Sequence, residues 1–124
     1  MLEALLNGGE MPNIPKSWKA FELKVARWMG GERRGADYSG FSGGKNDLIL
    51  PGWSVEIKHH KRVTYQMIVD ACVQAESAKE NPLDIPVAVI KKKHKPMEDT
   101  LFVMRKDEFL RHFVSPTNQA GEIE

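Results

Sequence analysis

The sequence predicts an α/β domain in which a mixed β-sheet is flanked by helices. Two observations predict this class: apolar residues recur at helical spacing in three segments, and short runs rich in β-branched residues lie between them. In chain order the expected elements are a helix, three strands, a helix, two strands and a closing helix, which suits a sheet covered by helices. The 124 residues are enough for one such domain.

The first helix is expected at residues 17–29. Ser17 can cap its start, and Gly30-Gly31 can end it. Its apolar stripe consists of Trp18, Phe21, Val25 and Trp28. We expect Trp28, like Trp53 further along the chain, to lie in the core rather than to stack on bases.

Three strands are expected next. Residues 32–45 are rich in glycine and serine, which indicates a short strand followed by a mobile loop. Residues 46–50 are the second strand, Pro51-Gly52 is a turn, and residues 53–58 are the hairpin partner of the second strand. In that partner alternate side chains point to opposite faces, so Trp53, Val55 and Ile57 face a core while Ser54, Glu56 and Lys58 share the other face.

The second helix is expected at residues 64–79, and Asn81-Pro82 stops it. Many residues of its buried face are small, so the helix can pack closely on a sheet. This face consists of Ile68, Ala71, Cys72, Ala75 and Ala78.

Two strands and a helix complete the domain. Residues 85–90 are strongly apolar and predict a central strand, and residues 100–104 predict another. A closing helix is expected at residues 106–113, with Phe109 and Phe113 directed inward.

Composition excludes several classes of protein. The chain is 41% hydrophobic and 28% charged, as in a soluble globular protein. No apolar run approaches membrane-spanning length and no signal-peptide pattern is visible, so we expect a cytoplasmic protein without membrane contact. The single cysteine, Cys72, excludes an internal disulfide and a multi-cysteine zinc site. We expect an N-terminal arm at residues 1–16, a folded domain at 17–114 and a flexible tail at 115–124.

Basic residues gather in three places, namely Arg33-Arg34, residues 58–62 and residues 91–95. The net charge is only +1, so any nucleic-acid binding would depend on such local clusters. Each cluster taken alone is explained as solvated surface, whereas all three together would form a basic face.

Glu56 and Lys58 lie two residues apart on an expected strand and therefore share one face. Another Glu-x-Lys tripeptide, Glu22 to Lys24, lies on a helix, where residues two apart do not face each other. The expected hairpin sets Asp47 across from the Glu56 region, so two carboxylates and a lysine converge. Mg²⁺ prefers carboxylate oxygens, and a metal there could bind a scissile phosphate and activate water. The alternative is a cross-strand salt bridge between Lys58 and an acid.

Asp47, followed after a short hairpin by Glu56-Ile57-Lys58 and then by a helix that carries Gln74, resembles the PD-(D/E)xK nuclease superfamily. The resemblance covers residues 18–113 and is strongest to the archaeal- and phage-type Holliday junction resolvases. It implies a restriction-endonuclease-like fold, with the active site at a hairpin, for the nuclease domain at 17–114.

Further features belong to the same resemblance. Glu22 lies on the first helix, and residues 33–44 form a segment rich in arginine, glycine and serine. One departure is Asn46, where the family has a proline that is not a metal ligand.

The resemblance implies a role for each site residue. Asp47 and Glu56 would be metal ligands with the Ile57 carbonyl as a third, and Lys58 would be the catalytic lysine. Glu22 would complete the acidic cluster, unless it is an ordinary exposed helix acid. Gln74 would point at the active site, although a solvent-facing glutamine explains its position equally well.

The implied DNA contacts lie in the glycine-rich segment and after the Glu-x-Lys strand. They are Arg33, Arg34, Ser39, Ser42, Lys45, His59, His60, Lys61 and Arg62. The choice within the arginine pair and within the serine pair stays open, and an ordinary flexible loop is the alternative. Adjacent histidines on a strand point in opposite directions, so His59 and His60 are poor partners for one zinc ion.

The resemblance implies a Mg²⁺-dependent endodeoxyribonuclease, in which Mn²⁺ can substitute. The expected substrate is a four-way (Holliday) junction, and the expected active species is a homodimer that makes paired symmetric cuts without a small-molecule cofactor. One alternative is a nicking or repair endonuclease that acts on flaps or forks. Another is a catalytically silent DNA-binding module of the same fold.

Overall fold

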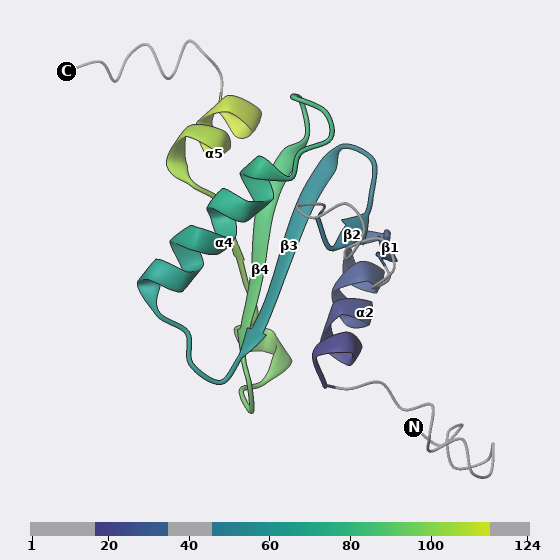
Figure 1. Ribbon diagram of the computed structural model, residues 1–124, viewed down its shortest axis with the longest axis vertical. Helices are drawn as coiled ribbons and strands as arrows, with labels where there is room; N and C mark the ends of the chain where they lie inside the picture. Colours follow the sequence, from purple (N-terminus) through teal and green to yellow (C-terminus); the bar gives the residue numbers. More distant parts are fainter. Residues whose placement is uncertain (1–16, 35–45, 115–124) are drawn as a thin grey trace.

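The computed structural model of the chain describes residues 17–34 and 46–114 (Figure 1). It has the mixed α/β class and the order of elements that the sequence predicts. The elements are α2 (Ser17–Met29), β1 (Glu32–Arg33), β2 (Leu48–Ile49), β3 (Trp53–His60), α4 (Tyr65–Ser77), β4 (Ile85–Lys92), a 3₁₀ turn (Met97–Asp99), β5 (Leu101–Val103) and α5 (Lys106–Phe113). None of the helices in these two ranges has the length and hydrophobicity that crossing a lipid bilayer requires.

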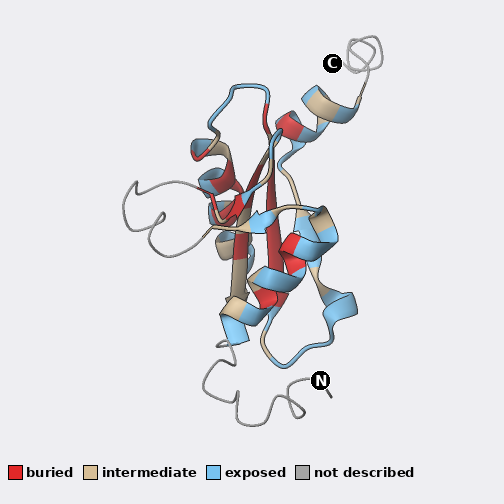
Figure 2. Cartoon of the chain, turned by 90° about the vertical axis from the view of Figure 1, so that its right-hand side faces the viewer, coloured by how far each residue is buried: buried red, intermediate tan, exposed pale blue. Residues whose placement is uncertain are grey.

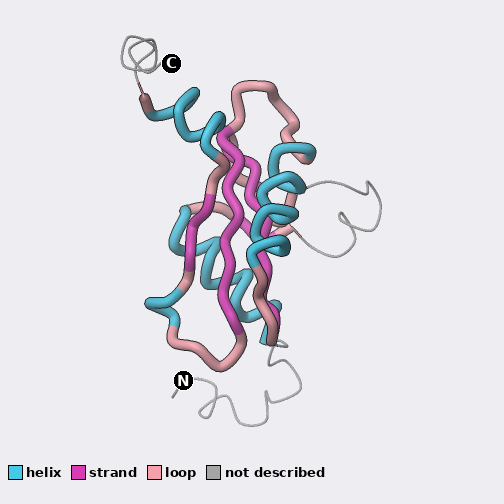
Figure 3. The backbone as a smooth tube through the Cα atoms, turned by 90° about the vertical axis from the view of Figure 1, so that its left-hand side faces the viewer, coloured by secondary structure: helices cyan, strands magenta, loops and turns pink. Residues whose placement is uncertain are grey.

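The main sheet has three strands in the order β3-β4-β5. β3 and β4 run parallel along the long axis of the molecule (Figure 3), and β5 pairs antiparallel with the end of β4. The sheet is therefore mixed, with the apolar strand β4 at its centre as expected. The helix α4 connects the two parallel strands, as such a connection requires.

The expected hairpin between residues 46–50 and 53–58 is only partly right. β2 forms its ladder with β1 in a separate two-stranded sheet, and β3 forms its ladder with β4. The chain changes partner at Asp47, whose N–H donates to the Val55 carbonyl (2.8 Å) while its carbonyl accepts from the Arg34 N–H (2.9 Å).

Each face of the main sheet is covered by a different helix (Figures 1 and 2). On one face Phe21 and Val25 of α2 pack with Val55 of β3 in the larger core cluster. On the other face Ala71 and Cys72 of α4 pack on β4. The small residues of α4 let the helix lie close to the strands. The buried Ser54 hydroxyl of β3 donates a hydrogen bond to the Ala75 carbonyl of α4 (2.6 Å).

Three aromatic side chains expected in the core are exposed instead. Trp28 is 47%, Phe109 49% and Phe113 53% exposed, whereas Trp53 packs on the core as expected.

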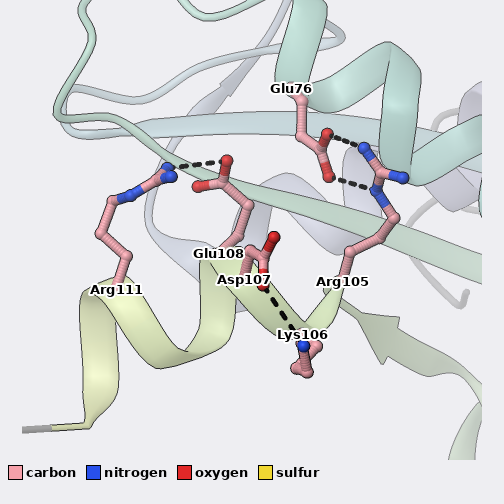
Figure 4. Close-up of a pocket in the computed structure, with 6 residues that line it drawn as sticks. All are labelled: Glu76, Arg105, Lys106, Asp107, Glu108 and Arg111. Atoms are coloured by element: carbon pink, nitrogen blue, oxygen red, sulfur yellow. Dashed lines mark hydrogen bonds and ion pairs between the residues drawn. The ribbon is translucent and has the colours of Figure 1, made fainter. Parts of the chain in front are cut away.

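The orientation of α5 explains two of these corrections. Its buried residue is Glu108, which forms ion pairs with Lys79 just after α4 (3.1 Å) and with Arg111 (2.9 Å). Just before α5, the Arg105 guanidinium donates two hydrogen bonds to the Glu76 carboxylate of α4 (Figure 4). The buried contacts of α5 are thus charged, and Phe109 and Phe113 line an apolar groove in which each stays about half exposed.

Candidate functional site

Asp47 lies beside the edge of β3 that β4 does not pair with. Its Oδ2 accepts a hydrogen bond from the Ile57 N–H (2.7 Å). Because the N–H and C=O of a strand residue point to the same edge, the Ile57 carbonyl faces this side as well. The buried Asn46 fixes the chain before Asp47, since its carbonyl accepts from the Arg34 guanidinium (2.9 Å).

Glu56 and Lys58 share a face of β3, as strand alternation predicts. The Lys58 Nζ lies 3.0 Å from the Glu56 Oε2, and the two side chains are only 25% (Lys58) and 14% (Glu56) exposed. The expected salt bridge between Lys58 and an acid is therefore present, but it lies within one strand rather than across two. Asp47 is close enough to both for their charges to interact. The negative charge of Asp47 raises the pKa of Glu56, and the positive charge of Lys58 lowers the pKa of Asp47.

Glu22 reaches this edge from α2. Its carboxylate forms an ion pair with the Arg33 guanidinium (2.7 Å), and its side chain is 14% exposed. The alternative of an ordinary exposed acid is therefore wrong. No sequence pattern indicated the pair with Arg33, because the two residues lie on different elements.

The pKa values of all three carboxylates at the site, Glu22, Asp47 and Glu56, are raised. Burial and then the Asp47 charge raise the pKa of Glu56 to about 7, against the opposing effect of Lys58. Burial also raises the pKa of Asp47, although the Ile57 N–H lowers it. Burial is the main cause that raises the pKa of Glu22 as well. The neighbouring charges of Lys58, Arg33 and Arg34 act in the opposite direction and lower the pKa of Asp47.

The other residues expected at the site, Gln74 and the DNA contacts, differ in their exposure and in their partners. Gln74 is exposed on α4. Arg33 and Arg34 both have protein partners, the latter through Asn46 and Glu80. The exposed residues after the Glu-x-Lys motif are His60, Lys61 and Arg62. Ser39, Ser42 and Lys45 lie outside the described residues.

The His59 side chain lies on the face of β3 opposite to Lys58 and His60. It packs on Phe21, with the ring centroids 5.0 Å apart. Burial, and then the nearby Lys91 and Lys93, lower the pKa of His59. The imidazole is therefore mostly neutral at pH 7.

The parallel pairing brings together two basic clusters that are far apart in sequence. His59 lies opposite Lys91, His60 lies opposite Lys92, and the Lys93 N–H donates to the His60 carbonyl (2.8 Å). Residues 58–62 and 91–95 thus lie side by side at one end of the sheet. A signal for this was present, since both clusters end strands that a helix connects.

The groups at this site that could hold a metal ion are oxygen donors. In the described part of the chain, no three His, Cys, Asp or Glu side chains are arranged to hold a metal ion. Mg²⁺ is usually held by one or two carboxylates and keeps several waters. Asp47 and Glu56 could be the two carboxylates of such a set, with the Ile57 carbonyl beside them.

Comparison with known proteins adds no relative. No protein-family model, curated protein or solved structure matches this chain. The chemistry open to the site follows from its side chains: two carboxylates can hold a hard cation, and a neighbouring ammonium can stabilise negative charge on a phosphate.

Proposed function

We propose that this protein is a metal-dependent DNA endonuclease with a restriction-endonuclease-like fold, and that it cuts four-way junctions as a homodimer. The observation that carries the proposal is the meeting of Asp47, Glu56 and Lys58 at one edge of β3, with Glu22 entering from α2. Acid, acid and lysine on adjacent backbone segments suit metal-assisted phosphodiester hydrolysis.

In this mechanism Asp47, Glu56 and the Ile57 carbonyl would hold Mg²⁺. A bound Mg²⁺ would neutralise negative charge on the scissile phosphate and would lower the pKa of the attacking water. Lys58, now paired with Glu56, would turn toward the phosphate and stabilise the negative charge that develops on its oxygens. Arg33 keeps the Glu22 carboxylate in place beside them.

The exposed residues His60, Lys61 and Arg62, together with the adjoining segment 91–95, would bind the DNA backbone next to this site. Phosphate contacts fix position without reading sequence, so they suit an enzyme that recognises a branched shape.

The function is tested by comparing cleavage of a four-way junction, a flap and a linear duplex in Mg²⁺. We expect paired nicks in the junction, little cleavage of the duplex and no cleavage of any substrate in EDTA. Preferred cleavage of the flap would favour the repair-endonuclease alternative. Absence of cleavage in both Mg²⁺ and Mn²⁺ would leave only the silent DNA-binding module.

Paired cuts require two active sites, and one face of the protein suits a second copy of the chain. We call the exposed side chains of Trp28, Phe102, Phe109 and Phe113 the aromatic face. Trp28 contacts Phe102, and the three phenylalanines line one apolar groove of about 550 Å³.

The size of the aromatic face matches the core of a dimer interface. Each of these side chains can bury about 150–250 Å², so four half-exposed ones leave on the order of 400 Å² of apolar surface. A patch of that size on one protomer, enlarged by its rim, approaches the roughly 800 Å² that each partner buries in a stable complex. The outer edge of β5 is not paired by any described strand, so a two-fold partner can also extend the sheet there.

Phe109→Glu is expected to convert a dimer into a monomer, because it places a charge in the centre of this face. Sedimentation at micromolar concentration measures the change. Tyr65→Glu is the matched control, since Tyr65 is an aromatic residue 81% exposed on α4. A wild-type protein that is monomeric both free and bound to a junction would exclude paired cleavage and favour a single-strand nickase.

A further inference from the structure

A pocket of about 280 Å³ adjoins the acidic cluster on the side of the basic segments. It is bounded by α2, by the end of β3 and by the turn after β4. The residues that line it are Trp18, Glu22, Ile57, Lys58, His59, His60 and Lys93. Three of them, Glu22, Ile57 and Lys58, also belong to the candidate site, so the pocket and the site share a wall.

The walls of the pocket are suited to an anion. Lys93 brings an ammonium group to it, and the exposed His60 adds a further donor. The two other charged groups in the wall have partners: Lys58 is paired with Glu56 at 3.0 Å, and the Glu22 carboxylate is paired with Arg33 at 2.7 Å. An ammonium group close to a cavity favours a phosphate oxygen over a neutral ligand.

The backbone holds Lys93 at the pocket. Its N–H donates a hydrogen bond to the His60 carbonyl (2.8 Å), and this bond connects the turn after β4 with the end of β3. The turn is sharp, because His94 adopts a φ of 68° and the Lys95 N–H donates back to the Lys92 carbonyl. Lys93 therefore lines the pocket, whereas Lys95 is exposed and does not.

His59 adds a second observation. Both of its ring nitrogens are buried, and neither has a hydrogen-bond partner among the described residues. A buried polar atom without a partner costs free energy, so such atoms in folded proteins usually have a protein, water or ligand partner. His59 is one of the residues that line this pocket.

We propose that this pocket is a phosphate subsite that binds the backbone phosphate next to the one that is cleaved. The proposal rests on the proposed nuclease function for the identity of the substrate, but the binding itself needs no metal. Trp18, 39% exposed at the pocket wall, offers an aromatic surface for the adjoining sugar or base. The subsite would fix the register of the DNA strand relative to Asp47 and Glu56.

The test measures binding of a short fluorescent single-stranded oligonucleotide in EDTA, where no cleavage occurs. Lys93→Gln is expected to raise Kd about tenfold, which is the usual value of one hydrogen bond to a charged group. Lys24→Gln removes the same charge from an exposed lysine of α2 that does not line the pocket, and it is the matched control, with an expected rise of less than about twofold. Equal effects of the two variants would overturn the proposal, because they would indicate general attraction only.

Two versions of the oligonucleotide, with and without a 5′-phosphate, identify the source of the phosphate. A loss of affinity for both versions assigns the pocket to an internal phosphodiester, as proposed. A loss confined to the 5′-phosphorylated version would overturn that assignment in favour of a strand end. If Lys93→Gln weakens binding but the wild type cuts no junction in Mg²⁺, the subsite stands and the proposed nuclease function fails.

Discussion

Asp47→Asn and Glu56→Gln are each expected to lower the rate of junction cleavage in Mg²⁺ by about 100-fold or more. Each substitution removes a negative charge that would hold the metal, and the amide keeps the size of the side chain. In Asp47→Asn the side-chain carbonyl oxygen can still accept from the Ile57 N–H, so the local fold is retained. Junction binding in EDTA should be unchanged or tighter, because a negative charge close to the DNA phosphates is gone.

The control for this experiment is Glu32→Gln, which removes an exposed carboxylate on β1. It should cut at the wild-type rate. Cleavage by either site variant at a rate close to that of the wild type in Mg²⁺ would exclude the assigned metal ligands.

The pH dependence of stability shows whether an inactive Glu56→Gln variant has lost a metal ligand or has lost its folded structure. The pKa of Glu56 is raised from 4.5 to about 7, so the folded protein favours the protonated acid. The stability from this preference is fully present below pH 4.5 and is lost as the pH rises through 7. In EDTA the glutamine variant should therefore have a higher thermal midpoint than the wild type at about pH 8, and a similar one at about pH 4.

Lys58→Ala is expected to reduce turnover by about 100-fold while leaving the affinity for the junction close to that of the wild type. The ammonium would act on charge that develops only in the transition state, so its loss affects kcat more than binding. Single-turnover cleavage at saturating enzyme measures this effect directly. Lys61→Ala is the comparison, because this exposed lysine would contact backbone phosphate and its loss should weaken binding instead.

The ion pair between Lys58 and Glu56 offers a purely structural role for the lysine. In that case Lys58→Ala would lower the thermal midpoint and retain full turnover. Measuring both quantities on the same preparation distinguishes the two roles. Full turnover with reduced stability would remove Lys58 from the mechanism.

Local sequence patterns were sufficient to predict the helices and the two faces of β3. Periodicity and capping predicted α2 at Ser17–Met29 and α5 at Lys106–Phe113 with the bounds that the structure has. Strand alternation predicted that Glu56 and Lys58 share a face, and their ion pair agrees. These features depend on residues close together in the chain, so a local pattern contains the information.

Which neighbour each face meets depends instead on long-range packing. Periodicity marked Phe109 and Phe113 as one apolar stripe, yet the buried residue of α5 is Glu108, which pairs with Lys79, and both phenylalanines stay about half exposed. The same limit applied to β2, which forms its ladder with β1, whereas the Asp47 N–H just before it donates to the Val55 carbonyl of β3.

The candidate site shows the same division. The residue types at Asp47, Glu56 and Lys58 could be identified in the sequence. The Arg33 partner of Glu22 could not, and neither could the exact register that sets His59 opposite Lys91. Such contacts join residues distant in the chain, and they form only when long-range packing and strand register bring their elements together. A sequence pattern specifies which residues form one face of a helix or strand. Which other element packs on that face depends on the free energy of the whole fold.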